Sequence, residues 1–318
     1  MNSKEQSAAC CPPAQSKRWE TREIVAELRA LREESLATRQ RAGKPIKLPS
    51  RKVLAGVVED LGAALFPNRL GGHDVVQESI DYFVGHTLEK ALRHLDEQIA
   101  LEMIFAERYS PAPDDNRQKA TEITRHFAAH LPQIRQTLET DIQAAYEGDP
   151  AARSADEVLV CYPGMTAILH HRMANLLHRL GAPLVARIIA EIAHSLTGID
   201  IHPGATIGQS FFIDHGTGVV IGETAVVGDR VRVYQAVTLG AKRFPVDENG
   251  ALLKGKERHP IVEHDVVIYA GATILGRITI GARSVIGGNV WLTRSVPPDS
   301  NITQAKHQNE VFNSGAGI

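Results

Sequence analysis

The chain has 318 residues, enough for two domains and a substantial core. Its formal net charge of −2 offers no basic surface for nucleic acid, and no apolar run approaches the roughly 18 residues of a membrane span. The first 16 residues lack the apolar stretch of a signal peptide, and the three cysteines do not form a disulfide framework. We therefore expect a soluble cytoplasmic protein that contacts neither nucleic acid nor membrane.

The first two thirds of the chain carry a helical pattern. Residues 1–16 are predicted to be a disordered tail, and residues 17–198 an α-helical domain, because apolar residues there recur at a period near 3.6. Pro132 is expected to break or kink one of these helices. The predicted helices are 19–42, 53–65, 75–108, a stretch from 116 to 146, 165–179 and 183–196.

From Ile201 onward an apolar residue returns at every sixth position. The three runs are Ile201, Ile207 and Ile213; Ile221, Val227, Val233 and Leu239; and Val262, Ile268, Ile274, Ile280, Ile286 and Leu292. A six-residue period is typical of a parallel β-helix with three short strands in each triangular coil. We predict an α+β chain in which residues 199–298 form this β-helix and residues 299–318 a C-terminal tail.

The six-residue period is interrupted twice. Between Ile213 and Ile221 the spacing is eight, and the added residues lie beside Asp214 and His215. After Leu239 the period resumes only at Val262, with a polar loop at 243–257. Long loops that leave a regular scaffold often carry function, so both interruptions are candidate sites.

Several motifs in and around the β-helix resemble those of the serine O-acetyltransferases. They lie at residues 148–150, 162–164, 199–205, 213–218, 222–225, 234–240 and 258–260. The resemblance implies that the β-helix is left-handed and that acetyl is transferred from acetyl-CoA, as co-substrate, to the hydroxyl of L-serine for cysteine biosynthesis. It implies direct attack on the thioester and no metal.

The chemistry of acetyl transfer to an alcohol requires a base, and histidine suits this role near neutral pH. The resemblance makes His215 the general base and Asp200 the acid that orients its imidazole. The two are 15 residues apart, close to one 18-residue coil, so we also expect stacked coils to bring them together. By the same resemblance, Asp149 and Asp214 face the ammonium group of serine, and Arg258 and His259 face its carboxylate. The positions that match the family's acetyl-CoA contacts are Gly240, Ala241, Ala270 and Gly288.

The assembly is predicted from the shape of the β-helix, and the partners are predicted from the resemblance. Triangular prisms pack around an axis, so we expect a homotrimer or a dimer of trimers. The terminal Ile318 is predicted to bind O-acetylserine sulfhydrylase, and inhibition by cysteine is a family expectation. After Pro298 the chain departs from the family's Gly-x-Pro-Ala element.

Three alternative functions remain open at the level of sequence. The same scaffold could acylate another amino alcohol or a sugar. A zinc-dependent carbonic anhydrase of the β-helix type would need three converging histidines, and His202, His215, His259 and His264 are available. A non-enzymatic recognition scaffold is the third.

Overall fold

The computed structural model describes residues 21–38, 47–72, 77–107, 115–243, 247–248, 250, 252–253 and 255–304. The chain divides into two compact units, Met1–Ile46 and Lys47–Ile318. The described part of the first unit is one helix, α1 (Thr21–Thr38). The predicted helical domain 17–198 is therefore not a single unit, because α1 belongs to the first unit and the remaining helices to the second.

The second unit begins with a helical region. Its helices are α2 (Arg51–Leu65), α3 (Pro67–Leu70), η1 (Gln77–Ser79), α4 (Ile80–Glu107), α5 (Asn116–Ala129), α6 (Leu131–Gly148), α7 (Ala155–Cys161), α8 (Pro163–Leu180) and α9 (Pro183–Thr197). The predicted break near Pro132 is confirmed, because α5 ends at Ala129 and Pro132 stands in the first turn of α6. The short helix α7 was not predicted.

Local capping explains several of these helix ends. The Ser154 hydroxyl accepts a hydrogen bond from the Glu157 amide at 3.1 Å, which starts α7. A proline stands in the first turn of α8 and of α9, where its missing N–H costs no helical hydrogen bond. Gly181 ends α8 with φ of 96°, a left-handed conformation that glycine adopts without strain.

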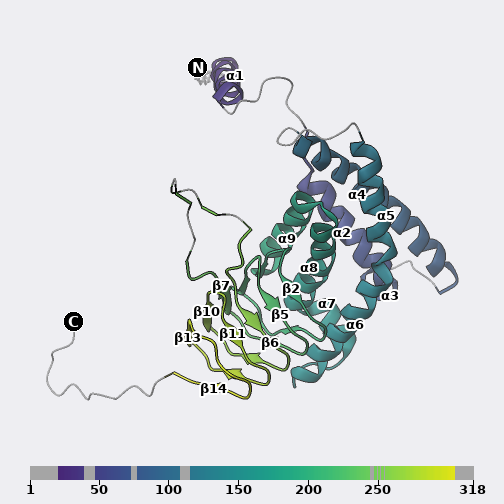
Figure 1. The fold of residues 1–318 in the computed structure, drawn as a ribbon. Coiled ribbons are helices and arrows are strands. Elements are labelled where there is room, and N and C mark those ends of the chain that lie inside the picture. Colours follow the sequence, from purple (N-terminus) through teal and green to yellow (C-terminus); the bar gives the residue numbers. More distant parts are fainter. Residues whose placement is uncertain are drawn as a thin grey trace, which may run out of the picture. The chain divides into compact units, whose positions relative to one another are not determined.

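The second part of this unit is a parallel β-helix with three faces (Figure 1). Face A contains β1 (Asp200–Ile201), β4 (Val220–Ile221), β7 (Thr238–Gly240), β10 (Thr273–Leu275) and β13 (Trp291–Leu292). Face B contains β2 (Thr206–Ile207), β5 (Val226–Val227), β8 (Ile261–Val262) and β11 (Thr279–Ile280). Face C contains β3 (Phe212–Ile213), β6 (Arg232–Val233), β9 (Val267–Ile268), β12 (Val285–Ile286) and β14 (Asn301–Ile302).

The six-residue period corresponds to the side chains that fill the prism. Ile221, Val233, Leu239 and Ile274 are all within 1% of complete burial. Because parallel strands stack in register, each inward residue lies on its equivalent in the next coil, for example Ile221 on Leu239. The predicted hexapeptide β-helix is therefore confirmed at the level of individual side chains.

The strand register locates both interruptions of the period. Asp200 pairs with Val220, so the first coil is 20 residues long, and Val220 pairs with Thr238, 18 residues on. The first interruption thus adds two residues at the corner between faces C and A, and the second emerges between β7 and β8, at the corner between faces A and B. We call these the C–A corner and the A–B corner.

The predicted tail starts too early. Residues 301–302 form β14, which pairs in parallel with β12 and extends face C by one strand. The departure from the family motif after Pro298 therefore still contributes a strand to the β-helix.

A buried ion pair fastens the helices to the β-helix. Arg172 on α8 donates from Nη2 to Asp141 Oδ1 at 2.9 Å and from Nη1 to the carbonyl oxygen of Ile207 at 2.6 Å. The same Asp141 oxygen accepts from the Phe211 amide at 2.9 Å. These contacts join α6 and α8 to the first coil of the β-helix. Loss of either partner would leave a buried, unpaired charge and would destabilise the fold.

Candidate active site

The C–A corner holds Asp214 and His215. Asp214 is buried, and its Oδ2 accepts a hydrogen bond from Arg232 Nη2 at 2.7 Å. Its other oxygen, Oδ1, lies 3.8 Å from His215 Nε2. The His215 side chain is 71% exposed, and the residue has φ of 60°, which places it in the left-handed region that few non-glycine residues adopt. The two added residues of the first coil thus project an imidazole from the prism beside a fixed carboxylate.

Arg232 was not identified from the sequence as a site residue. Its guanidinium lies over the rings of Phe212, at 4.9 Å, and Tyr234, at 4.7 Å. Phe212 is its neighbour in register on face C, so the stacking follows from strand pairing. Contact with two aromatic rings restricts the guanidinium, and in this position its Nη2 donates to Asp214.

A second carboxylate reaches this corner from the helical region. Asp149 follows the end of α6, and its Oδ2 accepts a hydrogen bond from the Tyr162 hydroxyl at 2.5 Å. That hydrogen bond lowers the pKa of Asp149 and raises the pKa of Tyr162 to about 12, so the carboxylate is ionised and the phenol neutral at pH 7. A hydrogen bond from the Ala151 amide and the nearby charge of Arg232 lower the pKa of Asp149 further. Asp149 therefore lies within electrostatic range of His215 and of Arg232, the partner of Asp214, and the binding roles of these residues stay a prediction.

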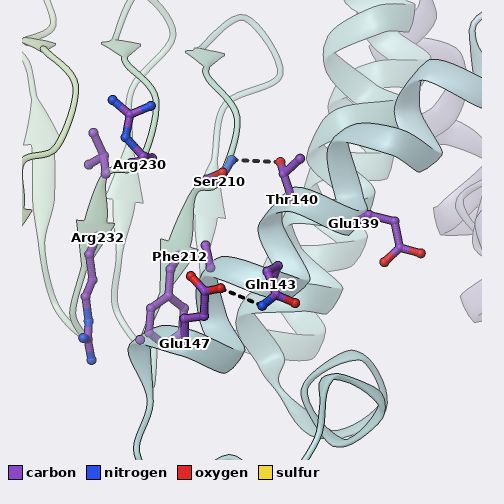
Figure 2. Close-up of a pocket in the computed structure, with 11 residues that line it drawn as sticks. Glu139, Thr140, Gln143, Glu147, Ser210, Phe212, Arg230 and Arg232 are labelled. Carbon is purple, nitrogen blue, oxygen red and sulfur yellow. Dashed lines mark hydrogen bonds between the residues drawn. The ribbon is translucent and has the colours of Figure 1, made fainter.

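A hollow of about 690 Å³ adjoins this corner, between α6 and face C. Figure 2 shows Thr140, Gln143 and Glu147 of α6 on one side and Phe212, Arg230 and Arg232 on the other. Arg232 therefore lines the hollow while holding Asp214. His215 does not line it, and in one protomer the imidazole faces solvent.

The A–B corner holds Arg258 and His259, at the end of the long loop. Arg258 Nη2 lies 2.6 Å from a carboxylate oxygen of Glu223. The Thr224 hydroxyl oxygen accepts from the Arg258 amide at 2.9 Å and from the His259 amide at 3.2 Å. These bonds hold the returning loop against the turn after β4. Arg277, also missed from the sequence, donates to the carbonyl oxygens of Thr224 and His259.

His259 is a neutral hydrogen-bond donor. Burial, followed by the neighbouring Arg258 charge, lowers its pKa to about 4. Its Nδ1 accepts from the Thr224 amide at 3.1 Å and lies 2.9 Å from the Thr224 hydroxyl. Since Nδ1 accepts, these contacts assign the ring proton to Nε2. Gly222 permits this placement, because a Cβ there would lie 2.1 Å from Nε2.

The two corners do not meet within one chain. Face A separates them by about six residues, or roughly 20 Å at about 3.3 Å per residue. Among the described residues, no hydrogen bond or ion pair joins Asp149, Asp214 or His215 to Arg258 or His259. The predicted serine-binding residues therefore form two half-sites in one protomer.

Asp200 does not contact His215 in the part of the chain that the structure describes. Its carboxylate lies near α9, where its ligand atoms and those of Glu191 and His194 fall within 4.8 Å of one another. The expected approach of Asp200 to His215 is thus not seen as a hydrogen bond or ion pair among the described residues, and the register pairs Asp200 with Val220. The role of Asp200 as the orienting acid stays a prediction.

Comparison with known proteins identifies the family. Residues 78–169 match the family model described as "Serine acetyltransferase, N-terminal". A plasmid-encoded serine acetyltransferase of Synechococcus elongatus is 58% identical over 275 residues, covering 85% of this chain and 86% of the relative. The chain belongs to the serine acetyltransferase family. It is accordingly an acyltransferase, and the family predicted from the motifs is confirmed.

Solved structures of the family confirm the fold class. Serine acetyltransferase isoform 3 of Entamoeba histolytica, in complex with cysteine, is 34% identical with a TM-score of 0.68, covering 91% of this chain and 96% of that one. The Neisseria gonorrhoeae enzyme, in complex with serine, is 28% identical with a TM-score of 0.52, covering 80% and 95%. An N-terminal helical region followed by a left-handed parallel β-helix is thus the fold of this serine acetyltransferase.

The remaining predicted positions have different outcomes. Ala270 and Gly288 lie on adjacent coils at the C–A corner, and Gly240 ends β7 beside Ala241 at the A–B corner. Ile318 lies outside the described residues. Across those described ranges, His202, His215, His259 and His264 do not converge as a metal-binding group, and no helix is long and apolar enough to cross a membrane.

Proposed function

We propose that His215 is the general base of acetyl transfer from acetyl-CoA to serine. Its imidazole removes the hydroxyl proton as the serine oxygen attacks the thioester carbon, so that a C–O bond forms and the C–S bond breaks. The imidazolium then returns the proton to the departing CoA thiolate. The observation that carries this proposal is the exposed imidazole 3.8 Å from a carboxylate that Arg232 holds in place.

Serine is recognised at both ends in this proposal. The ionised Asp149 and Asp214 bind its ammonium group, and Arg258 with the Nε2–H of His259 binds its carboxylate. The pKa of His259, lowered to about 4, supports a neutral donor at working pH. The Neisseria gonorrhoeae relative in complex with serine supports the choice of substrate.

The complete site forms between two protomers in this proposal. One chain supplies the C–A corner with Asp149, Asp214 and His215, and its neighbour supplies the A–B corner with Arg258 and His259. A cyclic trimer of prisms repeats this junction three times. The predicted acetyl-CoA positions divide in the same way, with Ala270 and Gly288 on the first corner and Gly240 and Ala241 on the second.

The base is tested by His215→Ala. We expect serine-dependent release of CoA thiol to fall by about 10²–10⁴-fold, the usual contribution of a general base. His264→Ala is the matched control, since this half-exposed histidine lies in the turn after β8 and its replacement should leave the rate unchanged.

Ethanolamine, which lacks the carboxylate of serine, tests whether another amino alcohol can be the acceptor. Equal rates with ethanolamine and serine would reject recognition of the carboxylate by Arg258 and His259.

The shared site is tested by mixing inactive subunits. His215→Ala and His259→Ala homotrimers each lack one half of every site. In randomly mixed trimers about a quarter of the junctions combine two intact halves, so about a quarter of the wild-type rate should return. A mixture as inactive as its parents would show that both half-sites must come from one chain.

The proposed roles of Asp200 and Asp214 can be distinguished by the kinetic effects of replacing each residue. Asp200→Asn should lower kcat with little change in KM for serine if Asp200 orients the base. Asp214→Asn should raise KM for serine, because it removes a charge from the ammonium side. An Asp200→Asn enzyme with unchanged kcat would remove Asp200 from the mechanism.

Two regulatory contacts complete the proposal. Cysteine, which the Entamoeba histolytica relative binds, shares the ammonium and carboxylate of serine and should compete with it. Ile318 is proposed to enter O-acetylserine sulfhydrylase as a C-terminal peptide. Sulfhydrylase binding that persists after deletion of Ile318 would reject this contact.

A further inference from the structure

The helix α1 exposes an apolar stripe that nothing in its own unit covers, as far as that unit is described. It has 18 residues, and Ile24, Leu28 and Leu31 are 53%, 48% and 60% exposed. A single helix of this length is marginal in water, and its stability in proteins usually comes from packing an apolar face. The stripe therefore calls for a partner surface.

The spacing of the stripe is that of a coiled coil. At about 100° per residue, Ile24, Leu28 and Leu31 fall within about 60° of one another around the helix. Their separations of four and three residues place Leu28 at a heptad a position and Ile24 and Leu31 at d positions. Thr21 is then the preceding a position.

The charges beside the stripe are segregated by sign. Glu23 and Glu27 lie on one flank, and Arg29 and Arg32 on the other. In the heptad, Glu27 is a g position and Arg32 the e position five residues on, the two that face each other across a parallel pair of identical helices. An antiparallel pair would instead oppose Glu27 to Glu27 and Arg32 to Arg32.

We propose that α1 is a self-association helix, which packs against α1 of other copies of this chain as a parallel, in-register coiled coil. The occupant of the stripe is thus a second copy of the same helix, selected by the Glu27–Arg32 complementarity. None of the residues assigned above to the proposed catalytic junction belongs to α1.

Disulfide crosslinking tests the proposal in the full chain. In a background with Cys10, Cys11 and Cys161 replaced by serine, Thr21→Cys places a thiol at the stripe, and Glu33→Cys places one on the opposite side of α1. In a parallel pair the two thiols introduced at position 21 would be adjacent, at an effective concentration in the millimolar range, so crosslinking should be on the order of tenfold faster than at position 33. In an antiparallel pair they would lie about 25 Å apart.

Charge reversal supplies a second readout. Glu27→Arg sets Arg against Arg32 of the neighbouring copy and should slow crosslinking at position 21, and Glu27→Arg combined with Arg32→Glu should restore it. Equal rates at positions 21 and 33, no crosslink at position 21, or no rescue by the double reversal would each overturn the proposal. Acetyltransferase activity, measured in parallel, should stay unchanged and confirms that every variant is folded.

Discussion

Arg232 and His215 approach opposite oxygens of the same carboxylate, Asp214. The Arg232 guanidinium donates to Oδ2 at 2.7 Å, and His215 Nε2 lies 3.8 Å from Oδ1. The Arg232 guanidinium in turn lies over the rings of Phe212 and Tyr234. The position of the carboxylate beside the proposed base thus depends on an arginine of the next coil.

The first prediction concerns Arg232. Arg232→Met should lower kcat/KM for serine by about 10–100-fold, because it leaves the buried Asp214 carboxylate without its charged partner. Arg230→Met is the matched control, since Arg230 lines the same hollow but pairs with Asp265. Steady-state kinetics with varied serine provide the measurement. If both variants lose activity equally, the loss is caused by the change in the lining of the hollow and not by the loss of the Arg232–Asp214 pair.

The second prediction concerns Tyr162. Tyr162→Phe removes the hydrogen bond to Asp149 and should raise KM for serine about tenfold, since a hydrogen bond to a charged group contributes about 1.5 kcal/mol or more. The pKa of Asp149 should rise towards its ordinary value, yet the group stays ionised at pH 7, so kcat should change little. Tyr146→Phe, at an exposed position, is the control. A fall in kcat without a change in KM would contradict this role for Tyr162.

The inward side chains could be predicted from the sequence because each hexapeptide has one position inside the prism. The same regularity made its interruptions visible, and both interruptions carry site residues, His215 and Arg258. The six-residue period shows which residues point inward. Where the period is interrupted, it also locates a corner, and neither step requires knowledge of how the coils pair.

The outward partners could not be predicted, because they depend on register. Arg232 meets Phe212 and Asp214 only because the two added residues of the first coil set which strands align. The same shift pairs Asp200 with Val220, where the regular 18-residue spacing had suggested proximity to His215. The helix α7 was missed because its seven residues carry too little periodicity, although the Ser154 cap before it was readable.

The third prediction concerns Gly222. A Cβ at this position would lie 2.0 Å from His259 Cδ2, so Gly222→Ala must displace the imidazole. We expect a large rise in KM for serine and a stability loss of about 1–3 kcal/mol from overpacking. Gly56→Ala is the control: nothing lies within 4 Å of its Cβ, and the helix α2 should tolerate alanine or gain stability. Wild-type kinetics for Gly222→Ala would show that the ring of His259 has room to move.

The fourth prediction concerns the pH dependence of stability. His171 on α8 is buried, its Nδ1 has no hydrogen-bond partner among the described residues, and burial lowers its pKa to about 3. In the unfolded chain its pKa is about 6.5, so between about pH 6 and pH 4 only the unfolded state binds this proton. Its contribution to stability is therefore complete above pH 6.5 and is lost as the pH falls, at about 1.4 kcal/mol per pH unit.

The contribution of His171 is measured as the slope of the free energy of unfolding against pH. A change in packing shifts this free energy by the same amount at every pH, so it does not alter the slope. Urea unfolding at fixed protomer concentration, repeated from pH 7 to pH 4, gives the free energy of unfolding at each pH. His171→Met should lower the slope of the free energy of unfolding against pH by the amount that corresponds to about one bound proton, or about 1.4 kcal/mol per pH unit. This change is expected whatever the effect of the substitution on stability at pH 7. Met173→Leu, fully buried on the same helix, should shift the free energy without changing the slope. A His171→Met variant with the wild-type slope would show that this histidine is protonated in the folded chain as readily as in the unfolded one.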